Sequence, residues 1–378
     1  MKVYLDYNAT APVRPDALQA VVLAMGNVGN ASSAHAAGRR ARETAETARE
    51  AVGALVGARA ADVVFTSGGT EANAQAVLSA VRAGSRRLIL SAAEHPCVVR
   101  TAEASGAAVE VWPINGDGLV ELDWLQARLA RWDASDGAPW VSLVTANNET
   151  GVIQPVAQAT ALVRAAGGRL HTDAVQAAGK IPLDMGALGV ETLSLSAHKL
   201  GGPQGVGALV HTPGASPTPL MLGGEQERGL RAGTINVPGI AGFGSAAVSA
   251  AAHLAEDIDP QEGWRDAVQS RLEDEAGITA FGAGAPRLKN TLCFGADGFA
   301  SDRQLMALDL AGVMVIAGSA CSSGKMKPSR VVAAMGHEDL AGSLLRVSGG
   351  WATAADDWDR FSEVWLEAWT RHKSRRAA

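Results

Sequence analysis

The sequence predicts an α/β fold in which a mainly parallel, seven-stranded sheet forms a large domain and a smaller α+β domain follows. Between residues 63 and 211, strand-length apolar runs alternate with helix-compatible segments. This alternation is typical of crossover units in a parallel sheet that is covered on both faces. Beyond about residue 255 it gives way to short, separated strands and longer helices. We therefore expect a large domain over residues 15–255 and a small domain formed by residues 1–14 and 256–378.

Hydrophobic spacing predicts the elements of the large domain. Residues 39–56 carry alanine, valine and leucine at helical spacing among arginine and glutamate, which predicts an amphipathic helix before the sheet. Helix-compatible segments within the sheet region include residues 71–82, 122–131 and 156–166. Ligands of such sheets bind at the carboxyl ends of the strands. The seven predicted strands are residues 63–66, 87–91, 108–112, 140–145, 169–173, 191–196 and 205–211.

The C-terminal part has a different pattern. An alanine-rich segment over residues 246–255 predicts a helix that leads into the domain boundary. We expect the first dozen residues to pack with the small domain or to cross between the two domains. The elements predicted in the small domain are helices at 264–275 and 354–371 and strands at 290–294, 313–316 and 344–348.

Composition argues against several classes of protein. The 378 residues are 47% hydrophobic and 19% charged, as is ordinary for a soluble enzyme. A net charge of −6 gives no general attraction to nucleic acid or anionic membranes, and no signal peptide or membrane span is evident, so we expect a cytoplasmic protein. Cys97, Cys293 and Cys321 are too scattered for a disulfide framework or a metal site. Any special cysteine is therefore expected to be reactive rather than structural.

Two of the predicted strands end in groups that suit an aldehyde cofactor. The strand at 191–196 leads through His198 to Lys199 and then into a glycine-rich segment, so it presents an amine beside backbone that can approach a phosphate. The strand at 169–173 ends in Asp173, a carboxylate able to hold a pyridine nitrogen protonated. A Schiff base to pyridoxal 5′-phosphate (PLP) requires this combination. The sequence therefore predicts PLP as the cofactor.

Other strand ends carry polar groups. Residues 66–73 contain Gly69 and Thr70 between a strand and a helix, which suits a phosphate cradle, although a turn capped by Thr70 is an alternative. His95 follows the strand at 87–91 and could stack on the cofactor ring and exchange protons with substrate; an ordinary loop histidine is the other interpretation. Asn148 and Gln176 offer side-chain amides that could bond the phenolic oxygen of the cofactor.

Cys321 lies in a run of small residues, 317–324, directly after the predicted strand at 313–316. A buried, inert cysteine is the common alternative and fits Cys293 and Cys97. For Cys321 we favour a reactive thiol, because nothing nearby in the sequence would bury it and Lys325 and Lys327 could favour the thiolate.

Two further segments suggest anion binding. Residues 223–234 are polar, glycine-dense and too long for a turn, and they end in Thr234, which indicates a functional loop rather than a surface excursion. Arg346 is a charge inside an apolar, strand-like segment. Such an arginine usually meets a carboxylate, and we favour that of a substrate over a buried salt bridge.

Together these segments resemble the cysteine desulfurases, PLP enzymes of fold type I in the class V aminotransferase group. The likeness covers nearly the whole chain. The lysine motif alone would indicate only a PLP enzyme, and the cysteine in 318–324 together with the loop at 223–234 makes the likeness specific. The matching segments are residues 4–10, 29–35, 66–73, 94–95, 147–151, 173–176, 196–199, 223–234 and 318–324.

The resemblance implies a role for each candidate residue. Lys199 would carry the cofactor as a Schiff base, Asp173 would pair with the pyridine nitrogen and His95 would stack on the ring. Arg346 would bind the substrate carboxylate, Cys321 would receive the sulfur, and a homodimer is implied because Thr234 would reach the phosphate of the partner subunit. The remaining cofactor contacts would come from Gly69, Thr70, Asn148, Gln176, Ser196 and His198, with Asn148 also near the substrate.

The predicted function is therefore cysteine desulfurase: removal of sulfur from L-cysteine to give L-alanine and a persulfide on Cys321. The persulfide would pass to a sulfur-acceptor protein, as in iron–sulfur cluster assembly or tRNA thiolation. One alternative is a selenocysteine lyase or another class V aminotransferase, which would not need a loop thiol. A non-catalytic sulfur carrier or scaffold is the alternative from a different class.

Overall fold

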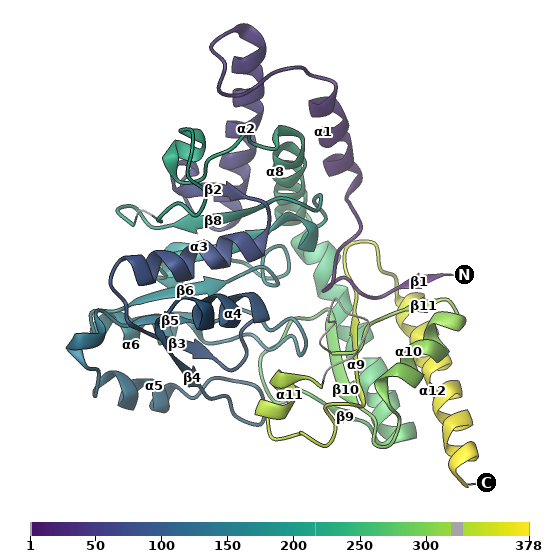
Figure 1. Ribbon diagram of the computed structural model, residues 1–378. Helices are drawn as coiled ribbons and strands as arrows, with labels where there is room; N and C mark the ends of the chain where they lie inside the picture. The colour runs from purple at the N-terminus through teal and green to yellow at the C-terminus, as the bar shows by residue number, and fades with distance from the viewer. Residues whose placement is uncertain (1, 216, 319–327, 378) are drawn as a thin grey trace.

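Seven strands form the central sheet of this computed structural model, which describes residues 2–215, 217–318 and 328–377 (Figure 1). The strand order is β2-β8-β7-β6-β5-β3-β4, and the predicted architecture is confirmed. The strands are β2 (Val63–Thr66), β3 (Arg87–Ser91), β4 (Ala108–Trp112), β5 (Trp140–Ser142), β6 (Arg169–Asp173), β7 (Thr192–Ser196) and β8 (Gly207–His211).

Strand direction decides where the polar strand ends meet. The neighbours from β7 through β6, β5 and β3 to β4 are all parallel. Strand β8 is antiparallel to both β7 and β2, so β2 points the same way as β7. All strands of the sheet except β8 therefore end at the same edge, and the side chains that follow them are brought together there.

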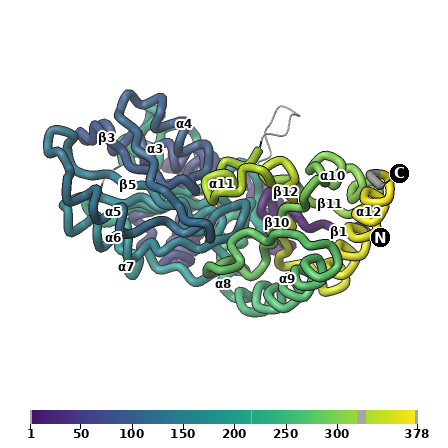
Figure 2. Tube along the Cα trace, turned by 90° about the horizontal axis from the view of Figure 1, so that it is seen from below, coloured from purple at the N-terminus to yellow at the C-terminus, as the bar shows by residue number. Residues whose placement is uncertain are grey.

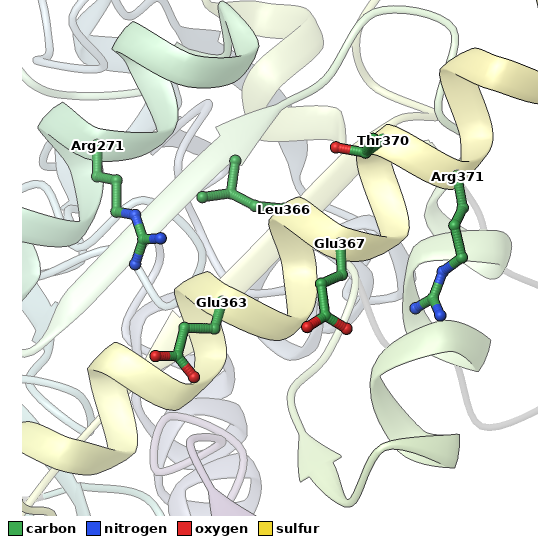
Figure 3. A pocket seen from close by; sticks show the side chains of 6 residues that line it. All are labelled: Arg271, Glu363, Leu366, Glu367, Thr370 and Arg371. Atoms are coloured by element: carbon green, nitrogen blue, oxygen red, sulfur yellow. The ribbon is translucent and has the colours of Figure 1, made fainter.

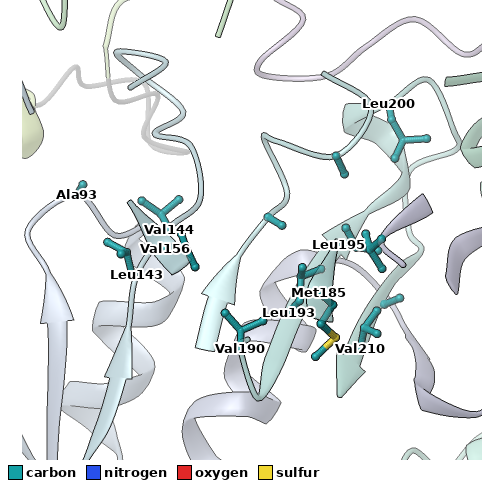
Figure 4. Close-up of a cluster of buried hydrophobic side chains, with 14 of the residues drawn as sticks. Ala93, Leu143, Val144, Val156, Met185, Val190, Leu193, Leu195, Leu200 and Val210 are labelled. Atoms are coloured by element: carbon teal, nitrogen blue, oxygen red, sulfur yellow. The ribbon is translucent and has the colours of Figure 1, made fainter. Parts of the chain in front are cut away.

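Helices cover both faces of the sheet, as alternation along the strands requires. Leu88, Leu90 and Trp140 pack on one face against α3 (Gly69–Arg82) and α4 (Pro96–Ala104). Ile89 and Val141 lie on the other face in the largest apolar cluster, part of which is drawn in Figure 4. Helices on that side include α5 (Leu122–Leu129), α6 (Val156–Ala165), the short α7 (Met185–Leu188), α2 (Ala36–Leu55) and α8 (Val237–Ala252).

The smaller lobe lies beside the sheet and holds its own apolar core (Figure 2). Strand β1 (Val3–Tyr4) pairs in parallel with β11 (Val313–Met314), so the beginning of the chain joins the C-terminal part. Both ends of the described chain lie on this side of the molecule (Figures 1 and 2). The other elements here are α9 (Leu254–Ala276), β9 (Thr279–Ala280), β10 (Thr291–Gly295), α10 (Ser301–Leu310), α11 (Arg330–Ala334), β12 (Leu344–Ser348) and α12 (Ala355–Ala377).

Helix α1 (Pro15–Met25) packs on α8 and presents an apolar outer surface. Leu18, Val22 and Met25 are each more than half exposed on it. In the described residues, no single helix is long and apolar enough to cross a bilayer, although α8 and α9, bent at 64°, pass that test as a pair. A surface hollow between α9 and α12 is lined by Arg271, Glu363, Leu366, Glu367, Thr370 and Arg371 and contains none of the predicted site residues (Figure 3).

Candidate active site

A cavity of about 380 Å³ lies at the carboxyl edge of the sheet. It is bounded by the ends of β6 and β7, the turns after β2 and β3, the segment after β5, and one residue of β12 from the smaller lobe. The structure brings most of the predicted site residues together here, from positions spread over the whole chain. Those that line the cavity are Gly69, Thr70, His95, Asn148, Asp173, Gln176, Ser196, His198, Lys199 and Arg346.

Two predicted residues are not among this group. Thr234 is exposed and does not line the cavity of its own chain, so its expected contact with the phosphate of a partner subunit stays a prediction. Cys321 lies within residues 319–327, outside the residues that the structure describes. Gly318, three positions earlier in the sequence, lines the cavity.

Lys199 enters the cavity from a short 3₁₀ turn directly after β7. Its Nζ donates hydrogen bonds to the backbone carbonyls of Asn8 at 2.5 Å and Ala9 at 2.7 Å. Burial lowers the pKa of Lys199 to about 8, and the charge of Arg346 adds to that effect. The amine therefore loses its proton close to neutral pH, as a Schiff-base lysine must.

Asp173 ends β6 and is almost fully buried. Its Oδ2 accepts a hydrogen bond from Asn73 Nδ2 at 2.7 Å, and its Oδ1 accepts one from Val175 N at 2.9 Å. N–H donors stabilise the ionised form of a carboxylate. The side chain can therefore face a pyridinium nitrogen as an anion.

His95 is the N-cap of α4, whose first residue is Pro96. Its Nδ1 accepts the N–H of Cys97 at 3.2 Å and contacts Cys97 Sγ at 3.0 Å. Burial lowers the pKa of His95, and the charge of Asp173 partly offsets this effect by raising it. Cys97 lines the cavity and also packs against the apolar cluster of α3 and α4, so its interpretation as an inert cysteine stays a prediction. The sequence signal for its contact with His95 is the N-cap spacing, since an N-cap side chain accepts from the backbone N–H two or three positions later.

Glu94 is a buried carboxyl beside His95, with Oε2 unpaired among the described residues. Burial, and to a lesser degree the charge of Asp173, raises its pKa to about 8, whereas an unfolded glutamate titrates near pH ~4.3. Between these values the folded protein holds a proton that the unfolded chain releases. The stability that Glu94 contributes below pH ~4.3 is therefore lost progressively as the pH rises to about 8.

Replacement of Glu94 by glutamine removes this titration and keeps the shape of the side chain. We expect the thermal unfolding midpoint of Glu94→Gln to fall less than that of the unchanged protein between about pH 5 and about pH 9. The difference should correspond to roughly 1 kcal/mol or more of unfolding free energy. Parallel decreases in the two proteins, measured by circular dichroism, would rule out a protonated Glu94.

Arg346 lies on β12 and corrects one expectation. It forms an ion pair with Asp6, Nη2 to Oδ1 at 2.8 Å, so the buried salt bridge that the sequence disfavoured is present. Its Nη1 donates to the backbone carbonyl of Asn148 at 2.9 Å, and its Nε has no partner among the described residues. Because Arg346 also lines the cavity, it has donor capacity left for a substrate carboxylate.

One end of the cavity suits a phosphate. Helix α3 begins at Gly69 after a glycine N-cap that supplies no side-chain capping bond. An added Cβ at Gly69 would lie 2.7 Å from a methyl group of Val175, so the backbone approach here requires glycine. Ser196 and His198 line the same cavity, and burial lowers the pKa of His198 to about 4, which makes it a neutral donor. The uncapped N-terminus of α3 adds a positive dipole end.

The sequence did not predict the residues beneath the cavity. Lys180 is buried, and its Nζ donates to Asn8 Oδ1 and Gln176 Oε1, each at 2.8 Å. Gln176 Nε2 in turn donates to the Asn8 carbonyl at 2.8 Å, so the remaining N–H of this amide is free for the cavity. Asn8 also bonds Thr291 of β10, which ties the smaller lobe to the site. Burial lowers the pKa of Lys180 well below its usual value.

These groups fit PLP. The cavity combines an amine that titrates near neutral pH, a carboxylate held by two N–H donors, an imidazole, an amide donor and an uncapped helix end. They match the aldehyde, pyridine nitrogen, ring face, phenolic oxygen and phosphate of that cofactor.

Comparison with known proteins shows which family the chain resembles. The Aminotransferase class-V family model matches residues 3–361. A cysteine desulfurase of Cereibacter sphaeroides is 40% identical over 374 residues, covering 96% of this chain and 94% of that protein. A cysteine desulfurase of Rhodobacter capsulatus is 42% identical over 341 residues, 88% of this chain and 87% of that protein. The X-ray structure of a NifS-like protein from Rickettsia africae superposes with a TM-score of 0.91 at 30% identity, covering 98% of this chain and 100% of that one.

Proposed function

The chain belongs to the class V aminotransferase family, and from this premise and the groups that line its cavity we propose that it is a PLP-dependent cysteine desulfurase. The observation that carries the proposal is the convergence of Lys199, Asp173 and His95 on one cavity, together with cysteine desulfurases about 40% identical over most of the chain. The product would be L-alanine, with the sulfur kept as a persulfide.

Different residues would hold the different parts of the cofactor. Lys199 would bind the aldehyde, Asp173 the pyridine nitrogen and Gln176 the phenolic oxygen, while the N-terminus of α3 with Ser196 and His198 would bind the phosphate. When bound, PLP supplies an electron sink that makes the α-proton of an amino acid acidic. Lys180 supports the arrangement, because its Nζ donates to Gln176 Oε1 and so orients the Gln176 amide.

The protein groups then act on the substrate. Arg346 would bind its carboxylate through the donor capacity that Asp6 leaves free. Lys199, as an amine with a pKa lowered to about 8, would take the α-proton. The thiolate of Cys321 would form a bond to the substrate sulfur while the carbon–sulfur bond breaks and its electron pair stays on the β-carbon. A proton delivered to the β-carbon and the return of a proton to the α-carbon then complete alanine.

We also propose a homodimer and an acceptor protein. The apolar outer surface of α1 supports a partner subunit, because a monomer would leave it facing water. A persulfide is useful only if it is handed on, so a sulfur-acceptor protein is part of the proposal. The proposed site of action is the cytoplasm.

The direct test is alanine formation by the purified, PLP-loaded protein from L-cysteine and, separately, from L-selenocysteine. We expect alanine from L-cysteine, with sulfide released in equal amount when a thiol reductant is present. Alanine from selenocysteine alone would indicate a selenocysteine lyase. A protein that binds PLP but releases no alanine from either substrate would indicate a carrier or scaffold.

A further inference from the structure

We infer that Asn73 and Cys97 are positioning residues that fix which nitrogen of His95 carries the proton, so that this imidazole acts toward the cavity as a donor from Nε2. The two residues form one hydrogen-bonded bridge, the Asn73–Cys97 bridge, between Asp173 and His95. The direction of every bond in it follows from groups that can only donate or only accept.

The other side of the Asn73 amide contacts His171, which is fully buried in β6. Burial lowers the pKa of His171 to about 3, so its ring is neutral and carries one proton. The ring lies between Thr192 Oγ1, 2.9 Å from Nδ1, and Asn73 Oδ1, 2.9 Å from Nε2. An amide oxygen only accepts, so the proton of His171 is on Nε2 and Thr192 donates to Nδ1.

The amide of Asn73 can take only one orientation. Its Oδ1 accepts from His171 and from Ser194 Oγ at 2.6 Å, and its Nδ2 donates to Asp173 Oδ2 at 2.7 Å. In the flipped orientation, the amide oxygen would lie against the Asp173 carboxylate with no proton between them. One hydrogen of Nδ2 therefore points to Asp173, and the second is directed at Cys97 Sγ, 3.4 Å away.

Cys97 transmits this orientation to His95. Burial raises the pKa of the Cys97 thiol to about 12, with a further contribution from the charge of Asp173, so the sulfur keeps its proton. The Cys97 backbone N–H can only donate, so its 3.2 Å contact makes His95 Nδ1 an acceptor. The Cys97 S–H, with Sγ 3.0 Å from the same nitrogen, can then donate to Nδ1 while Sγ accepts from Asn73. With two donors on Nδ1, the proton of a neutral His95 belongs on Nε2.

It follows that His95 and Lys199 would have different roles in proton transfer, and this step rests on the proposed function. His95 would face the reaction as a hydrogen-bond donor rather than as a base, because Nε2 has no lone pair available, and Lys199 would be the base. The same amide donates to Asp173, so the bridge couples the carboxylate expected at the ring nitrogen to the imidazole expected over the ring. The raised pKa of Cys97 argues against the thiol as a second sulfur acceptor.

The test compares the tautomer and the turnover in the unchanged protein, Cys97→Ser and Cys97→Ala. Nitrogen-15 spectra of histidine-labelled protein without substrate, with the His95 signals assigned by their loss in His95→Gln, should show the Nε2–H form in the unchanged protein and in Cys97→Ser. In Cys97→Ala, we expect a shift of the His95 signals toward the other forms. The kcat for alanine should fall about 2- to 10-fold in Cys97→Ala, with KM changed less than about twofold, and Cys97→Ser should restore most of it.

The Nδ1–H tautomer in the unchanged protein would overturn the inference, and so would Cys97→Ala matching Cys97→Ser in both measurements. Sulfur found on Cys97 by mass spectrometry after cysteine addition would also overturn it. The tautomer of the unchanged protein is measured without substrate, so it does not depend on turnover. A protein with the Nε2–H form that released no alanine would reject the proposed function and leave the assigned proton position intact.

Discussion

Replacement of Lys199 by alanine is expected to lower alanine formation from L-cysteine by about 10⁴-fold or more, because one side chain supplies both the covalent anchor and the base. The Lys199 amine points into the cavity and, among the described residues, hydrogen-bonds only the backbone carbonyls of Asn8 and Ala9. Its pKa, lowered to about 8, keeps a usable fraction of free amine near neutral pH. The visible absorbance of the lysine-bound cofactor should be lost in the same variant.

Lys289→Ala is the matched control. This lysine pairs with Asp259 on the outside of α9, away from the cavity, so absorbance and turnover should stay at the level of the unchanged protein. Reconstitution with PLP followed by absorbance and alanine assays would check both variants. A Lys199→Ala protein that kept the absorbance band would refute the anchor, and one that kept its turnover would refute the base.

The strands that build the site could be predicted from the sequence almost residue by residue. Strands β2, β3, β4, β6 and β12 have the predicted bounds. Strand β5 ends at Ser142 rather than at residue 145, although the N–H groups of Leu143 and Thr145 still bond carbonyls of β6. The domain boundaries expected near residues 14 and 255 stay a prediction.

Helices without a polar face could not be predicted in the same way. In α1 the apolar residues Leu18, Val22 and Met25 face outward, so the sequence lacks the alternation that marks an amphipathic helix. Helix α9 begins at Leu254, ten residues before the predicted start, and includes Pro260 within its first turns. As the seventh residue of the helix, Pro260 has no N–H to donate to the carbonyl four residues earlier, a loss that makes a helix hard to predict here.

In the candidate site, too, some residues could be predicted from the sequence and others could not. Lys199, Asp173 and His95 could be found because parallel strands deliver their ends to one edge, a rule that needs no contacts. Asn8, Asn73 and Lys180 could not, because their importance lies in contacts between distant parts of the chain. Lys180 is buried only because Asn8 arrives from the beginning of the chain to accept its hydrogen bond.

A change at Cys321 should separate two steps, binding of the cofactor and acceptance of sulfur. Lys199, Asp173 and the uncapped end of α3, which would bind PLP, all lie in the described part of the chain. A change at Cys321 should therefore leave the cofactor bound. Sulfur acceptance, by contrast, needs a thiolate, because a serine hydroxyl at neutral pH is neither ionised nor able to form a persulfide.

We therefore expect Cys321→Ser to retain the absorbance of the unchanged protein while alanine formation from L-cysteine falls by about 10³-fold or more. In the unchanged protein, mass spectrometry after cysteine addition should find one extra sulfur on the peptide that contains Cys321. The peptides with Cys97 and Cys293 are internal controls, since burial raises the pKa of both thiols. Undiminished turnover in Cys321→Ser would mean that sulfur leaves the substrate without a thiol acceptor at this position, as in a lyase that releases it directly.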